Sequence, residues 1–199
     1  MADPCVRPRW PGDDRAAVFR VGAKHGYRAF MADLSVEEVL EHPCVRRVAA
    51  VLTSFGVRGQ IVVLDDAAQT ARQAAAALGI ETAQIANSLV FKAYRKDSSI
   101  RPLLVLTSGV HRVDTIKVAD LLELSDVILA DAEFVRAHTG FTIGGVAPVA
   151  FLHPVETVVD ISLSRYEQVW AAAGHPYTVF PTSYDELLRL TGGHAAEVA

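Results

Sequence analysis

The sequence predicts an α+β fold in which helices flank a mixed, partly closed β-sheet. Segments of strand periodicity and segments of helical periodicity interleave along the 199-residue chain. A polar hairpin at residues 92–102 joins two apolar strands. So short a connection requires antiparallel pairing, and a purely parallel doubly wound sheet is therefore not expected. A composition of 51% apolar and 21% charged residues suits one folded domain with a single core.

The chain begins with a segment that lacks periodicity. Residues 1–33 contain several prolines and charges, so we expect a loosely ordered extension there and the domain proper at residues 34–199. Ser35 and Glu38 have the spacing of a capping box, which predicts a short helix that Pro43 ends or restarts.

The remaining elements are predicted from periodicity and from capping residues. In order, they are a helix at 45–55 ended by Gly56, a strand at 60–64, an alanine-rich helix at 67–78 capped by Asp65 and Asp66 and stopped by Gly79, strands at 88–93 and 103–107, a helix capped by Asp114 and running through Leu122, a strand at 127–129, a helix capped by Asp131 and ended by Thr139 and Gly140, a strand at 156–161, a helix at 164–173, a strand at 178–180, and a last helix opened by a capping box at Ser183 and Glu186.

A glycine-dense segment at residues 139–148 is the most informative part of the chain. It lacks the lysine and hydroxyl of a Walker loop and the spacing of a dinucleotide fingerprint. Gly144 and Gly145 permit positive φ and leave backbone N–H and C=O groups uncovered, while Pro148 fixes φ and pushes Ala147 towards an extended conformation. The segment is therefore either a stiff binding loop or a tight turn between two strands.

Several familiar catalytic arrangements are missing from the sequence. The seven histidines occur singly and there is no C-x-x-C pair, so a zinc hydrolase is disfavoured and no metal site is expected. Ser108 lacks the second glycine of a nucleophile elbow. His111 and His138 could act as bases, although a lone histidine is more often a surface or structural residue. Cys5 and Cys44 do not indicate a disulfide framework.

Charge and hydropathy limit the kinds of binding partner that the sequence predicts. No run of 18 apolar residues and no secretory signal are present, so we expect a cytoplasmic protein without a membrane partner. The net charge is −4, but residues 1–30 hold six basic and three acidic side chains, and residues 92–101 hold four basic side chains and one acid. These are either local patches that suit the end of an RNA or solvated charges.

Four blocks, in this order, resemble the YbaK/prolyl-tRNA-synthetase-associated-domain family. They are residues 84–91 (QIANSLVF), residues 102–109 (PLLVLTSG) followed by 112–114 (RVD) and Lys117, residues 139–148 (TGFTIGGVAP), and residues 173–175 (AGH) leading to 185–191 (DELLRLT). Together they cover roughly residues 35–192. Asn87 is a departure, because many relatives carry lysine at that position.

The resemblance implies a mixed, barrel-like sheet surrounded by helices and the activity of an aminoacyl-tRNA deacylase without a cofactor. The implied partners are the acceptor end of an aminoacyl-tRNA and a synthetase, with no DNA. An aminoacyl-tRNA is already an activated ester, so water or a ribose hydroxyl can attack it if N–H donors hold the oxyanion. The backbone of Gly144, Gly145 and Val146 is the candidate oxyanion site, and Asn87 is the candidate for holding a ribose hydroxyl.

The remaining candidates are predicted to bind substrate. They are Ser88, Ser108, Gly109, Asp114, Lys117, Thr139, Gly140, Ala147 and Pro148. A neutral Asn87 cannot neutralise a phosphate, so Lys117 and Lys92 are candidates to supply the missing charge. Asp114 is first a helix cap and only second a ligand contact.

Three hypotheses follow. The first is a trans-editing deacylase that removes a small mischarged amino acid, such as alanine or cysteine on proline tRNA. The second is a binder of aminoacyl-tRNA or of an aminoacyl-adenylate-like ligand, in which Asn87 marks lost hydrolysis. The third is a small-molecule-binding domain without RNA.

Overall fold

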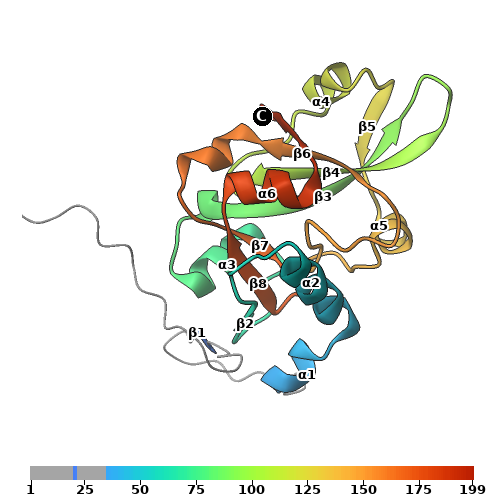
Figure 1. Cartoon of the computed structure of the whole chain (residues 1–199). Helices are drawn as coiled ribbons and strands as arrows, with labels where there is room; N and C mark the ends of the chain where they lie inside the picture. The colour runs from blue at the N-terminus through green and yellow to red at the C-terminus, as the bar shows by residue number, and fades with distance from the viewer. Residues whose placement is uncertain (1–19, 22–34) are drawn as a thin grey trace, which may run out of the picture.

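The computed structural model describes residues 20–21 and 35–199 (Figure 1). The extension predicted for residues 1–33 lies outside the described residues, apart from strand β1 (Arg20–Val21), which pairs in parallel with β2. The helices are α1 (Val36–Leu40), α2 (Pro43–Ser54), α3 (Ala71–Leu78), α4 (Thr115–Leu121), α5 (Ala132–Thr139) and α6 (Tyr184–Thr191), with short 3-10 helices at Thr82–Gln84 and Ile161–Arg165. The other strands are β2 (Val62–Leu64), β3 (Ile85–Tyr94), β4 (Ile100–Ser108), β5 (Asp126–Leu129), β6 (Glu156–Asp160), β7 (Val169–Ala172), β8 (Thr178–Thr182) and β9 (His194–Ala196).

The strands form one mixed sheet with helices on both faces, which confirms the predicted fold class. The hydrogen-bonded order is β1-β2-β8-β7-β3-β4-β6-β9, and β5 adds to β3 beside this path. β3 and β4 form the predicted antiparallel hairpin, whereas β4 and β6 are parallel. In Figure 1, β7 and β8 run across the direction of β3 and β4, so the sheet is strongly twisted.

β3 has three neighbouring strands. One edge of β3 pairs with β4 from Ala86 to Tyr94, and the other edge is shared by two strands. On this second edge, β7 pairs with Ile85 and Ala86, and β5 pairs from Phe91 to Tyr94. Residues 87–90 therefore have no strand neighbour on that edge, and a gap opens there between β7 and β5.

The start of α3 differs from the prediction. The N-cap is Thr70 rather than Asp65 or Asp66, and Thr70 and Gln73 form a reciprocal capping box. Ala68 is buried, and its N–H donates to the carbonyl of Pro176 at 2.8 Å. The segment before Thr70 is thus held as a loop against the turn that precedes β8, and the helix cannot begin earlier.

The predicted helix at 164–173 is wrong. This stretch contains the end of a 3-10 helix and then β7, in which Val169 and Ala171 are buried while Trp170 and Ala172 are half-buried. That alternation is a strand period, and pairing with both β8 and β3 overrides the helix propensity of the alanines. β9 was not predicted, because a run of His-Ala-Ala carries no strand signal.

The last helix begins as predicted, but its capping box is only half formed. Ser183 accepts from the N–H of Glu186, whereas the Glu186 carboxylate accepts from Thr182 and Arg189 instead of the N-cap backbone.

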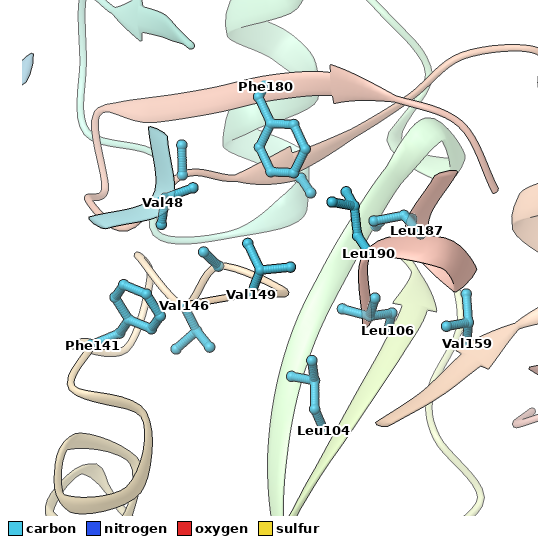
Figure 2. Packing of buried hydrophobic residues seen from close by; sticks show 14 of the residues in the cluster. Val48, Leu104, Leu106, Phe141, Val146, Val149, Val159, Phe180, Leu187 and Leu190 are labelled. Carbon is cyan, nitrogen blue, oxygen red and sulfur yellow. The ribbon is translucent and has the colours of Figure 1, made fainter. Parts of the chain in front are cut away.

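The core is divided between the faces of the sheet. On one face, residues of α2, α5 and α6 pack against Leu104 and Leu106 of β4; on the other, α4 packs against Leu103 and Val105. Figure 2 shows that the loop after α5 belongs to the core on the face covered by α2, α5 and α6. Phe141, Val146 and Val149 of this loop point into that core, together with Val48, Leu104, Leu106 and Phe180. This burial fixes the second half of the glycine-rich loop.

Candidate functional site

A cavity of about 370 Å³ lies at the gap in the edge of β3. Its walls come from residues 68–74 at the start of α3, residues 85–89 of β3, residues 170–172 of β7, the turn after β7, and residues 143–146 of the glycine-rich loop. Five of the predicted site residues line it together, namely Asn87, Ser88, Gly109, Gly144 and Val146. These five residues come from three separate segments of the chain, which the fold brings together at this cavity.

The glycine-rich loop presents its backbone to this cavity. Thr142 and Ile143 are exposed, whereas residues 145–149 are buried. Gly144 has φ +90°, which disfavours any side chain. A Cβ on Gly145 would lie 3.0 Å from the Cα of His175, so glycine is required there by packing.

One hydrogen bond within the loop reduces the number of N–H groups that could bind an oxyanion. The Gly145 N–H donates to the Thr142 carbonyl at 3.0 Å and closes a turn. Within the described part of the chain, the N–H groups of Gly144 and Val146 donate to no protein acceptor. Of the three N–H groups in the predicted oxyanion site, those of Gly144 and Val146 therefore remain without an acceptor among the described residues.

Ser88 presents polar groups to the gap in the sheet. The Val90 carbonyl accepts from the Ala130 N–H at 3.0 Å across the β5 side of β3. Since backbone groups alternate along a strand, the N–H and C=O of Ser88 point to the same side, between β7 and β5. The Ser88 hydroxyl is buried and has no hydrogen-bond partner. A buried polar atom without a partner is costly, which is a feature typical of a binding site.

Asn87 contributes a second polar group from the opposite face of β3. It shares that face with Ile85 and with Trp170, the parallel partner of Ile85 in β7. Its half-buried side chain makes no hydrogen bond to any described residue. The amide is thus available to a ligand.

Arg72 and Trp170 also line the cavity, and the sequence analysis did not select either. Arg72 is the second residue of α3, and Trp170 has a buried indole N–H without a partner. An arginine in an alanine-rich helix and a tryptophan in a segment interpreted as helix gave no sequence signal for a site. The lining contains no histidine, cysteine, aspartate or glutamate.

Three predicted substrate-binding residues lie outside the cavity lining. The Ser108 hydroxyl donates to the Ala83 carbonyl, and Asp114 caps α4 by accepting from the N–H groups of Ile116 and Lys117. Lys117 pairs with Glu197 at 3.2 Å. Lys92, the other candidate for compensating charge, pairs with Asp131.

The remaining predicted residues shape the loop rather than line the cavity. Thr139 is buried, and its hydroxyl donates to the Val135 carbonyl at 2.6 Å. Gly140 ends α5 with φ +74°. Ala147 and Pro148 are buried where the loop enters the core.

The histidines weighed as bases lie elsewhere. The His138 ring lies 4.2 Å from the ring of Phe134 in a tilted arrangement, and His111 pairs with Asp160 at 2.8 Å in a separate hollow. Burial alone would raise the pKa of Asp160, but hydrogen bonds from the N–H groups of Ser162 and Ser108 and from His111 outweigh it and hold the pKa below its ordinary value.

His175 supports the loop from behind. Its backbone abuts Gly145, and its ring lies 5.0 Å from that of His42. Burial lowers the pKa of His175, and the neighbouring His42 lowers it further. The neutral ring is therefore favoured beside the loop.

Among the described residues, no group of three or more histidine, cysteine, aspartate or glutamate side chains is placed to hold a metal ion. No helix among these residues is both long and apolar enough to span a membrane.

These features define an α+β domain with a cavity that is bordered by a glycine-rich loop. Residues 65–190 match the model of the aminoacyl-tRNA editing domain, and the chain belongs to that family. A crystal structure of a candidate trans-editing enzyme for prolyl-tRNA synthetase is similar, with 38% identity and a TM-score of 0.71 over 78% of this chain and 96% of that one.

Two relatives show how the similarity is distributed. The YwhH protein of Bacillus subtilis is 27% identical over 130 residues, which are 65% of this chain and 80% of that protein. The proline–tRNA ligase of Bacillus licheniformis is 35% identical over 106 residues, which are 53% of this chain and 17% of the ligase. The match with the ligase thus involves only a small part of a much longer protein.

Proposed function

We propose that the protein is a trans-editing deacylase that hydrolyses the ester between a small, wrongly attached amino acid and the end of its tRNA. The observation that carries this proposal is the cavity itself. It joins free backbone N–H groups of Gly144 and Val146 to the polar groups of Asn87 and Ser88, and its lining offers no acidic or imidazole side chain. Such a site suits an ester that needs positioning more than it needs a protein nucleophile.

The chemistry follows from these groups. A water molecule attacks the ester carbonyl carbon. If the free ribose hydroxyl of the terminal adenosine attacks first, the amino acid moves to that oxygen, and water then attacks the new ester in the same way. The negative charge that develops on the carbonyl oxygen is stabilised by the N–H groups of Gly144 and Val146. The bond from the carbonyl carbon to the ribose oxygen then breaks, and that oxygen takes up the proton released by the attacking water. The products are the free amino acid and an uncharged tRNA.

The substrate that we propose carries a small amino acid. A synthetic site for a larger amino acid rejects a smaller one weakly, since a missing methylene is worth only about 1–3 kcal/mol, and a second hydrolytic site corrects the error. Alanine or cysteine on proline tRNA is our leading substrate, supported by the ligase relatives and by the structural neighbour.

The test is a panel of tRNAs carrying correct and incorrect amino acids, incubated with the purified protein. We expect release of alanine or cysteine from proline tRNA and no release of proline. Release of no amino acid from any tRNA would contradict the proposal.

A non-catalytic binder is the second candidate, and Asn87 is the observation that favours it, because many relatives of the family resembled carry lysine there. Binding of the panel without turnover would support it, whereas neither binding nor turnover would leave a small-molecule domain. For the deacylase we further propose a cytoplasmic location, action beside prolyl-tRNA synthetase, and no DNA partner.

A further inference from the structure

Among the described residues that line the cavity, Arg72 is the one with a charge, and the others have apolar or neutral polar side chains. The side chain starts from the first turn of α3, where Thr70 accepts from the N–H of Gln73 at 3.3 Å and the Gln73 side chain accepts from the N–H of Thr70 at 3.1 Å. The capping box therefore fixes the backbone from which Arg72 projects.

The Arg72 guanidinium is also unengaged. It makes no hydrogen bond or ion pair with any residue that the structure describes, and its side chain is exposed. Lys92, Arg95 and Lys117, by contrast, each pair with a carboxylate. A guanidinium presents a planar set of donors that matches a phosphate, and charge-assisted bonds of this kind are among the strong ones.

We infer that Arg72 binds the phosphodiester that joins the terminal adenosine to the preceding nucleotide of the tRNA, while the aminoacyl ester occupies the cavity. The inference rests on the proposed function. A ligand bearing a single phosphate at this position would meet one positive charge and no negative one within the lining. The lysines expected from the sequence to supply that charge are paired elsewhere, and Asn87 cannot supply it.

The test compares two substrates that differ in this phosphodiester. One is the alanyl ester of adenosine, which has none, and the other is alanyl-tRNA for proline. Arg72→Gln should lower kcat/KM on the tRNA by roughly tenfold or more, since a charged hydrogen bond is lost. The same variant should hydrolyse the adenosine ester at the wild-type rate, and Arg72→Lys should retain part of the activity on tRNA.

Salt dependence supplies a second readout. For Arg72→Gln, the slope of log affinity against log salt should become shallower by about 0.7, the value for one phosphate contact on a single strand. Arg136→Gln is the matched control, because Arg136 is an exposed helical cation of α5 outside the cavity lining. It should leave both kcat/KM and the slope unchanged.

The outcomes distinguish failure of the inference on Arg72 from failure of the proposed function. Equal losses on both substrates, or an unchanged slope, would overturn the role of Arg72 in binding phosphate. If the wild-type protein hydrolysed neither substrate, the proposed function would fail. The affinity of wild type and Arg72→Gln for the dinucleotide cytidylyl-adenosine, which contains the phosphodiester, would then still decide the inference on Arg72.

Discussion

Asn87 and Ser88 are neighbours in β3, yet they present their side chains to opposite faces of the sheet at the gap between β7 and β5. The sequence identified both because they stand in a block that resembles a known family. It missed Arg72, whose position depends on where α3 begins. Asp114 caps α4 as predicted, but it lies outside the cavity lining, and Lys117 pairs with Glu197 instead of lining the cavity.

Substitution of Gly144 tests the loop backbone. Gly144→Ala places a side chain at φ +90°, with its Cβ 3.3 Å from the Cα of Gln69, and should cost roughly 1–3 kcal/mol of stability. If the Gly144 N–H is displaced from the oxyanion, turnover should fall by about 10²-fold. Gly79→Ala is the control, since Gly79 has φ +68° and open space around it. It should destabilise the protein without reducing turnover, and equal rates in both variants would make the loop only a turn.

Asn87 separates the deacylase from the binder. Asn87→Ala should lose roughly 0.5–1.5 kcal/mol of transition-state stabilisation from one neutral contact. Asn87→Lys should strengthen tRNA binding in a salt-sensitive way, because it adds a charge to the cavity. Deacylation and affinity measured at several salt concentrations check both. Inactive wild type combined with an active Asn87→Lys would favour the binder, and identical behaviour of all three proteins would remove Asn87 from the site.

Among the elements, the hairpin of β3 and β4 was predictable because its apolar strands and polar connection are local in sequence. β7 and β9 were not, since their alanines become strands only through pairing with distant segments. The ends of β4 and β6 are tied by Asp160, which accepts from Thr107, from the N–H groups of Ser108 and Ser162, and from His111. No local sequence pattern predicted this junction.

The junction predicts acid sensitivity. Because the pKa of Asp160 is lower in the folded protein than in the unfolded chain, its contribution is fully present above the unfolded value of about 3.9 and is lost as the pH falls through the folded value. Asp160→Asn should therefore lower the unfolding free energy by about 1.5–3 kcal/mol at pH 7. The loss should become progressively smaller below about pH 4. Denaturant unfolding at several pH values measures this. Asp120→Asn, on the exposed side of α4, is the control, and a pH-independent difference for Asp160→Asn would contradict the assignment.

For the whole molecule, the α+β class and helices on both faces of a mixed sheet could be predicted, because the interleaved periods and the family blocks agree. The strand order could not, since three partners for β3 depend on pairings between residues far apart in sequence. The cavity forms at that point, so its lining could be only partly predicted.

The cavity lining predicts how the protein responds to chelators. Among the described residues that line the cavity, none is of the types that usually bind transition metals, so the proposed deacylation should survive exhaustive treatment with EDTA. The rate on mischarged proline tRNA before and after treatment is the measurement. Loss of activity that zinc restores would contradict the proposed metal-free mechanism.

The gap beside β3 also affects how the protein folds. Its borders are brought together by the parallel pairing of Ile85 with Trp170 and by the contact of Gly145 with His175, so the cavity does not exist in any contiguous fragment. Such non-local closure is expected to come late and slowly in folding. Binding of an uncharged tRNA end should consequently stabilise the domain against global unfolding, and it should slow amide exchange in β3 and β7 together rather than in one segment alone.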